Sequence, residues 1–187
     1  MTEDHLRRIR HASLRERVVS ADQAASLIRD GMVLGMSGFT RAGEAKAVPM
    51  ALAERAKRAP MKVTLMTGAS LGNDLDKTMA EAHLLSRRIP FMSDPALRRA
   101  INAGEVMYID QHLSETVEQL RTCQLPPVDI AIVEAVAITE DGGTGPDGKS
   151  LMLGGQNDYA TVLSNGAGWF ITSSNRLAGN TRFAEAS

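Results

Sequence analysis

The chain has 187 residues, of which 43% are apolar and 23% charged, and its net charge is −1. This size and composition are typical of one globular domain with a sizeable core. The balanced charge and the 4% aromatic content argue against nucleic acid or an anionic membrane as a partner, and the single cysteine, Cys123, excludes an intramolecular disulfide.

The amino-terminal segment, residues 1–19, is rich in arginine but has no apolar core of the kind found in a secretory signal. Its acids Glu3, Asp4 and Glu16 argue against a mitochondrial presequence. No apolar run approaches the roughly 18 residues of a membrane span. We therefore expect a solvated, partly helical arm on a cytoplasmic protein.

Helix signals recur along the chain. Residues 20–23 have the form of a capping box, followed by an apolar face at Ala24, Leu27 and Ile28 and a stop at Gly31. Further helices are expected at 47–57, around 75–82, from Pro95 to a stop at Gly104, and after Ser114 with Leu113, Val117 and Leu120 facing inward.

Short apolar runs between these helices have the length of strands. We expect strands at 32–36, 62–66, 106–109, 128–133 and 169–172, with a short extended piece at 88–92. The run 128–133 suits a strand buried on both faces. Strands that alternate with helices predict an α/β fold, in which a mostly parallel sheet is flanked by helices.

Two small-residue loops follow expected strands, at residues 37–43 and 67–72. Open α/β sheets bind their ligands at the carboxyl ends of strands, and glycines let the backbone approach a substrate closely. A tight connection with no ligand is equally compatible with this spacing.

Residues 143–150 match the phosphate-binding pattern G-x-x-x-x-G-K-S letter for letter. That motif needs a strand directly before it and a helix directly after it. Here acids precede it, Pro146 removes a backbone N–H, and glycines at 154–155 disfavour a helix. An exposed turn is favoured, and nucleotide binding by Lys149 and Ser150 is the alternative.

Other residues of chemical interest form no motif. No metal-ligand spacing links the four histidines, His5, His11, His83 and His112, and Cys123 has no recognisable histidine partner. Glu134 ends a buried strand, so its carboxylate must be paired or face a cleft. A structural hydrogen-bonding role is favoured for it over chemistry.

An ordered set of segments resembles the amino-terminal half of the acetyl-CoA hydrolase/transferase family of class I CoA-transferases, which includes succinyl-CoA:acetate CoA-transferase. The matching segments are 8–10 with 14–18, 37–40 with 42–43, 67–70, Arg98 with 101–105, Asp110 with 112–114, and 133–135 with 137–143. The resemblance implies a domain of the NagB/RpiA/CoA-transferase type, in a protein of two such domains with the active site between them.

The resemblance also implies chemistry. A glutamate attacks an acyl-CoA thioester, giving an acyl-glutamyl anhydride and then a glutamyl-CoA thioester, and the acyl group passes to a carboxylate or to water. Acyl-CoA and small carboxylates are the implied partners, with coenzyme A as substrate and no resident cofactor or metal. The implied substrate-binding residues are Gly38, Phe39, Thr40, Gly43, Thr67, Gly68, Ala69 and Ser70, and Ser70 matches a position that lines the acyl or carboxylate pocket.

The family's nucleophilic glutamate belongs to its carboxy-terminal domain, and no glutamate of this chain matches that motif. We therefore assign no catalytic residue and expect the chain to be inactive alone, as a fragment or as part of a split enzyme. The expected organisation is an arm at 1–19, the CoA-transferase-like domain at 20–175 and a frayed tail at 176–187. A homo-oligomer, association with a carboxy-terminal half, and a non-catalytic partner domain all remain open.

Overall fold

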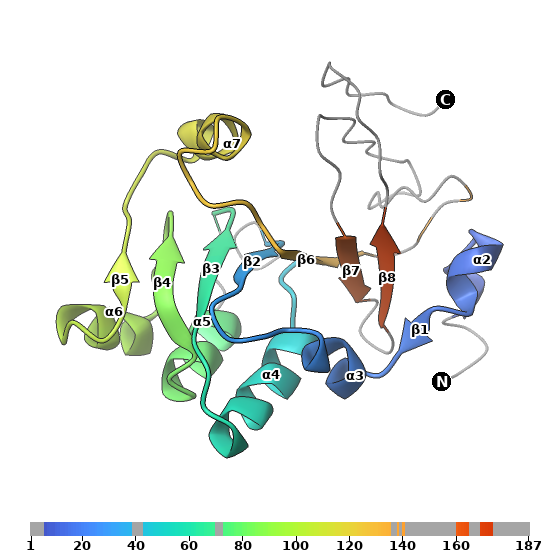
Figure 1. Cartoon of the computed structure of the whole chain (residues 1–187), viewed down its shortest axis with the longest axis horizontal. Helices are drawn as coiled ribbons and strands as arrows, with labels where there is room; N and C mark the ends of the chain where they lie inside the picture. Colours follow the sequence, from blue (N-terminus) through green and yellow to red (C-terminus); the bar gives the residue numbers. More distant parts are fainter. Residues whose placement is uncertain are drawn as a thin grey trace.

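The computed structural model describes residues 6–38, 43–69, 73–135, 138, 140, 160–164 and 169–173. They form an eight-stranded sheet in the order β1-β8-β7-β6-β2-β3-β4-β5. Every pairing from β7 across to β5 is parallel, whereas β8 is antiparallel to both β7 and β1. The predicted α/β fold with a mostly parallel sheet is confirmed (Figure 1).

The strands are β1 (Val18–Val19), β2 (Val33–Met36), β3 (Val63–Thr67), β4 (Leu85–Ile89), β5 (Met107–Tyr108), β6 (Ile130–Glu134), β7 (Ala160–Ser164) and β8 (Trp169–Ser173).

Helices lie on both faces of the sheet. Figure 1 shows α3 to α6 as a row along the sheet, with α7 apart from them near the carboxyl ends of β3 and β4. Alternate residues of β2 and β3 divide between two apolar clusters, with Leu34 and Leu65 in the larger cluster and Val33 and Met66 in the smaller. The helices are α2 (Ala12–Arg15), α3 (Ala21–Ser26), α4 (Ala47–Arg58), α5 (Asn73–Glu81), α6 (Pro95–Asn102) and α7 (Leu113–Arg121).

Local capping signals set the helix ends. Ser20 and Gln23 exchange both hydrogen bonds of the predicted capping box. The Asp94 carboxylate accepts from the N–H groups of Ala96 and Leu97 at the start of α6, and Gly104 follows that helix with a φ of 75°. These ends depend on neighbours in sequence, which is why the sequence predicts them.

Three sequence expectations are wrong in detail. Helix α3 ends at Ser26, and Leu27, expected on its inward face, is 43% exposed. The extended piece expected at 88–92 is β4, which starts and ends three residues earlier. In β6 only Ile132 is fully buried, so the strand is not buried on both faces along its length.

The predicted inward face of α7 is right for Leu120 but wrong for Leu113 and Val117. Val117 is 73% exposed and Leu113 is 38% exposed, whereas Thr116 is buried. Thr116 accepts a hydrogen bond from the Gln111 amide, and Leu120 packs against the smaller apolar cluster. The helix is therefore turned so that positions 116 and 120, one turn apart, face the sheet.

The amino-terminal segment is partly helical as expected, but it is not freely solvated. Ile9 and Leu14 are buried, Ile9 forms a β-bridge with Ile138, and β1 pairs with β8 at the sheet edge. The domain boundaries at 19 and 175 stay predictions. The phosphate-loop pattern at 143–150 and the tail at 176–187 lie outside the described residues. No described helix has the length and apolar character needed to cross a membrane.

Candidate functional site

Three neighbouring parallel strands, β6, β2 and β3, end at the same edge of the sheet. Their register pairs Met36 with Ile132 on one side and with Thr67 on the other. The loops that follow β2 and β3 therefore start side by side, and Glu134 at the end of β6 lies next to them. This is the edge at which open α/β sheets bind ligands.

The backbones of the two glycine loops touch. A Cβ atom added to Gly68 would lie 3.0 Å from the carbonyl oxygen of Gly38, so no side chain fits there without moving that loop. Gly43 has a φ of 63°, which favours glycine, and Thr67 donates its hydroxyl hydrogen to the Gly68 carbonyl at 2.8 Å. The two loops that follow the expected strands therefore lie together at the carboxyl edge of the sheet.

Five of the eight predicted substrate-binding residues lie among the described residues. Gly38 and Gly68 are in direct proximity, Thr67 is buried at the end of β3, Ala69 follows Gly68, and Gly43 closes the first loop. Phe39, Thr40 and Ser70 lie outside the described residues. Substrate binding by any of the eight stays a prediction.

Glu134 is paired, as the sequence analysis requires. Its carboxylate accepts a hydrogen bond from the Lys46 ammonium at 2.5 Å, and its backbone N–H donates to the Ser37 hydroxyl at 2.8 Å. The Glu134 side chain is 32% exposed and that of Lys46 54% exposed, so the pair lies at the surface of the site. No local pattern in the sequence predicts that Lys46 and Ser37 meet Glu134, because they lie 88 and 97 positions away from it.

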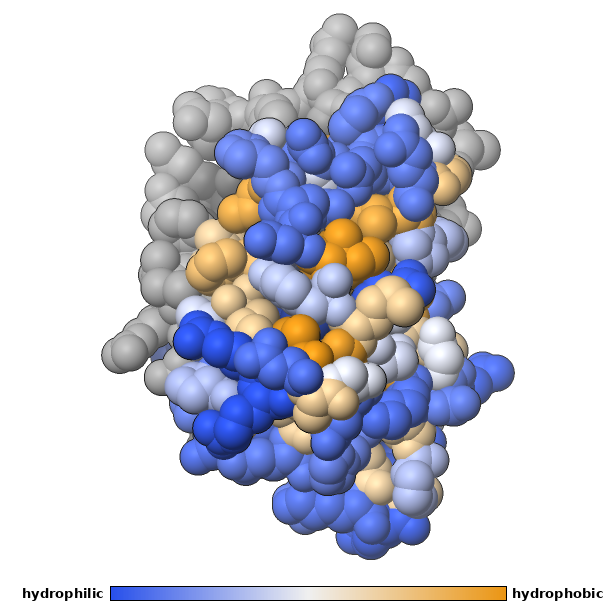
Figure 2. Space-filling view, turned by 90° about the vertical axis from the view of Figure 1, so that its left-hand side faces the viewer, coloured by the Kyte–Doolittle hydropathy of each residue, from blue (hydrophilic) through white to orange (hydrophobic). Residues whose placement is uncertain are grey.

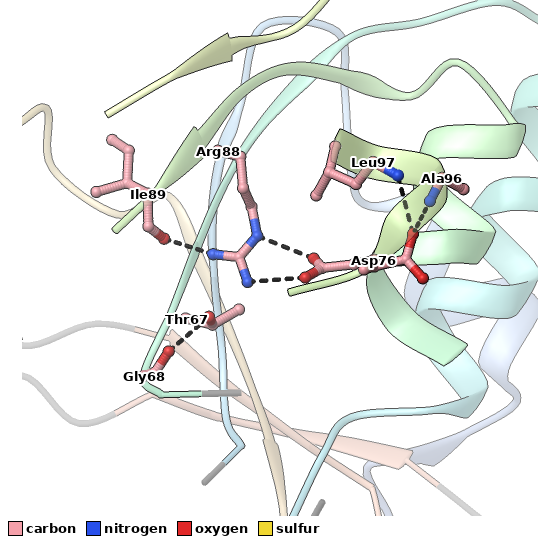
Figure 3. A network of polar contacts seen from close by, with 8 residues as sticks. Thr67, Gly68, Asp76, Arg88, Ile89, Ala96 and Leu97 are labelled. Carbon is pink, nitrogen blue, oxygen red and sulfur yellow. Dashed lines mark hydrogen bonds and ion pairs between the residues drawn. The ribbon is translucent and has the colours of Figure 1, made fainter. Parts of the chain in front are cut away.

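A buried ion pair supports the next part of this edge (Figure 3). The Arg88 guanidinium at the end of β4 donates to both carboxylate oxygens of Asp76 in α5, at 2.9 and 3.2 Å, and to the Ile89 carbonyl at 2.6 Å. Arg88 is 0% and Asp76 2% exposed. Burial raises the pKa of the Asp76 carboxyl, against the opposing effect of Arg88.

The Arg88–Asp76 pair ties the start of α5 to β4. Figure 3 shows it beside Thr67 and Gly68, which begin the loop that leads into α5. The pair therefore fixes the start of the helix to which the second glycine loop leads. The sequence signal for the pair is weak, because Arg88 is one of two adjacent arginines in β4 and Asp76 is one of two aspartates in the first turn of the preceding helix.

Two other kinds of site, a metal centre and a groove at the opposite edge of the sheet, are alternatives to this edge among the described residues. The part of the chain that the structure describes contains no group of three or more His, Cys, Asp or Glu suited to a metal ion. A groove of about 500 Å³ lies at the amino ends of the strands, lined by residues that include Asp30, Lys57, Lys62 and His83. We favour the opposite edge as the site, because ligands of such sheets bind where the strands end.

Comparison with known proteins gives the family. The model of the "Acetyl-CoA hydrolase/transferase N-terminal domain" matches residues 3–148. The chain belongs to the acetyl-CoA hydrolase/transferase family. The resemblance noted in the sequence is thereby confirmed.

Curated members of the acetyl-CoA hydrolase/transferase family are similar over most of this chain. Succinyl-CoA:acetate CoA-transferase of Clostridium kluyveri is 46% identical over 138 residues, which are 73% of this chain and 26% of that protein. Propanoyl-CoA:succinate CoA transferase of Escherichia coli is 36% identical, covering 66% of this chain and 26% of that protein. Acetyl-CoA hydrolase of Saccharomyces cerevisiae is 32% identical, covering 83% of this chain and 31% of that protein. The chain spans roughly a quarter to a third of the length of these relatives.

Solved structures confirm the fold. The acyl-CoA transferase YdiF of Escherichia coli O157:H7, in a thioester complex with CoA, has a TM-score of 0.54 and 14% identity, covering 67% of this chain and 36% of that chain. A variant of the decarboxylase AibA/AibB has a TM-score of 0.51 and 20% identity, covering 68% of this chain and 65% of that one. At these identities the likeness establishes the CoA-transferase-type fold alone.

Proposed function

We propose that this domain forms one wall of the acyl-CoA and carboxylate site of an acetyl-CoA hydrolase or CoA-transferase. The observation that carries the proposal is the backbone contact between the loops after β2 and β3, in a chain whose family relatives exchange or hydrolyse acyl-CoA thioesters. Because Gly38 and Gly68 lack side chains, the backbones of the two loops can approach each other, and a substrate can approach them closely.

The role proposed for this chain is binding and orientation. Gly38, Gly43, Thr67, Gly68 and Ala69 line the wall, and Phe39, Thr40 and Ser70 complete the expected set. The family nucleophile is a glutamate of another domain, and Glu134 is held by Lys46 and Ser37. We therefore assign no residue of this chain to the covalent step, and treat coenzyme A as a substrate.

A domain graft tests the proposal directly. The matched segment of the Clostridium kluyveri succinyl-CoA:acetate CoA-transferase is replaced by the corresponding residues of this chain, at 46% identity. We expect the graft to transfer CoA from succinyl-CoA to acetate. A graft that folds cooperatively and has the oligomeric state of its parent, yet shows no transfer, would contradict the proposal.

A second assay uses the 187-residue chain alone with acetyl-CoA, with and without acetate. We expect no release of CoA, because a pocket wall without the family nucleophile has no group to carry the acyl intermediate. Robust release of CoA by the isolated chain would show that a nucleophile lies within it.

A role as a non-catalytic partner domain is the second candidate function. Exposed large apolar side chains include Phe91 after β4, Met107 in β5, and Leu113 and Val117 in α7. Figure 2 shows hydrophobic residues across the middle of the face that looks onto the β5 edge. Exposed apolar surface of this kind favours association. Light scattering after size-exclusion chromatography tests it, and a stable monomer at high concentration would count against it.

A further inference from the structure

The Ser37 hydroxyl joins three parts of the site. It donates to the Gly43 carbonyl at 2.6 Å and accepts from the Glu134 N–H at 2.8 Å, while the Ser37 N–H donates to the Ile132 carbonyl at 2.8 Å. One residue thus connects the start of the first glycine loop, the end of that loop and the neighbouring strand.

Lys46 closes the same arrangement from the side of α4. Its ammonium donates to the Glu134 carboxylate at 2.5 Å and to the Glu44 carbonyl at 3.0 Å. Lys46 is the residue before α4, so these contacts tie the start of the helix to the end of β6. Both ends of the segment between β2 and α4 are therefore attached to Glu134.

The energetics indicate that this arrangement positions a loop more than it stabilises the fold. An ion pair as exposed as Lys46–Glu134 contributes little to the stability of a fold, because water screens its charges. The apolar core that holds the sheet together lies between the strands and α3 to α6. The polar cluster lies instead at the edge where Gly38 approaches Gly68 to a backbone contact.

We propose that Ser37, Lys46 and Glu134 form a clamp of positioning residues that fixes the ends of the 38–43 loop against the 67–70 loop. The proposal rests on the proposed function, in which these loops form the substrate wall. The clamp residues act through the loop and are assigned no contact with substrate. A misplacement of about 1 Å in such a wall lowers activity by as much as about 10²-fold.

Amide hydrogen exchange on the 187-residue chain tests the clamp without any assay of activity. We expect Ser37→Ala to speed exchange at Glu134 and over residues 43–46, because the hydroxyl that joins them is lost. Ser37→Thr keeps a hydroxyl and should keep the protection. Ser86→Ala is the matched control, since the Ser86 hydroxyl also donates to a backbone carbonyl, that of Val63 at 3.1 Å, near the amino end of the sheet.

Hydrogen exchange also tests the Lys46–Glu134 ion pair of the clamp. Glu134→Gln weakens the attraction for Lys46 and should speed exchange over residues 43–46, with the exchange of α6 unchanged. Exchange over 43–46 that is the same in wild type, Ser37→Ala and Glu134→Gln would overturn the proposal.

Kinetics of the domain graft test whether the clamp serves the substrate. We expect Ser37→Ala to lower kcat/KM by about tenfold or more, through a misplaced wall, with Tm nearly unchanged. Ser37→Thr should restore the rate and Ser86→Ala should not alter it. An active graft that is indifferent to Ser37→Ala would refute the positioning role alone. A wild-type graft that folds and assembles like its parent but is inactive would refute the proposed function, and the exchange measurements would still decide the clamp.

Discussion

Replacing Arg88 by methionine is the sharpest test of how this edge of the sheet is supported. Methionine keeps most of the length of the side chain but removes the guanidinium, which makes two bonds to Asp76 and one to the Ile89 carbonyl. The Asp76 carboxylate, 2% exposed, then loses its cationic partner.

The expected cost of Arg88→Met is large. Breaking a buried pair by removing one partner costs about 3–5 kcal/mol. A domain of this size has about 5–15 kcal/mol of total stability, so the variant loses a large part of it. At about 2–4 °C for each kcal/mol, Tm should fall by about 6–20 °C.

Urea and thermal unfolding followed by circular dichroism measure this change. The double variant Arg88→Met/Asp76→Leu has no charge at either of these two positions and should recover most of the loss, since well-packed apolar residues often replace a buried pair without cost. The control is Arg121→Met, which removes a similar two-bonded pair with Glu118 that is exposed to solvent, and it should leave Tm unchanged. The reasoning is wrong if Arg88→Met unfolds like wild type, or if the double variant is no more stable than the single one.

Three further predictions concern Gly68, Asp94 and the pH dependence of the Arg88→Met variant. Gly68→Ala places a Cβ 3.0 Å from the Gly38 carbonyl oxygen, and should cost about 1–3 kcal/mol in urea unfolding and lower the activity of the graft. Asp94→Ala removes the cap of α6 and should cost about 0.5–2 kcal/mol, whereas Asp94→Asn keeps an acceptor and most of the stability. In Arg88→Met the lowering effect of Arg88 is gone, so the folded-state pKa of Asp76 rises further above its ordinary value of about 3.9. The folded state then binds the proton more tightly than the unfolded state does. The unfolding free energy of this variant should therefore fall as pH rises from the ordinary pKa of Asp76 to its raised folded-state pKa. An unfolding free energy that does not change with pH over this range would contradict the prediction.

The sequence by itself determined the local structure and the family. Capping residues such as Ser20 with Gln23, and Asp94 before Pro95, act on backbone groups within a few positions, so their pattern specifies where α3 and α6 begin. Apolar runs placed β2, β3 and β6 to within a few residues. The ordered motifs identified the family, and the glycine loops were placed at the edge where they meet.

Only the tertiary structure decided which side chains meet across that edge and which face of α7 is buried. Ser37 reaches a residue 97 positions away, and Arg88 pairs with Asp76 on a separate element. The periodicity of α7 offered Leu113 and Val117 as inward residues, but the packing of Leu120 and the bond to Thr116 turned the helix differently. Parallel strands pair only after the chain has crossed over through a helix, so their neighbours in space are distant in sequence, and no local pattern specifies the contacts between them.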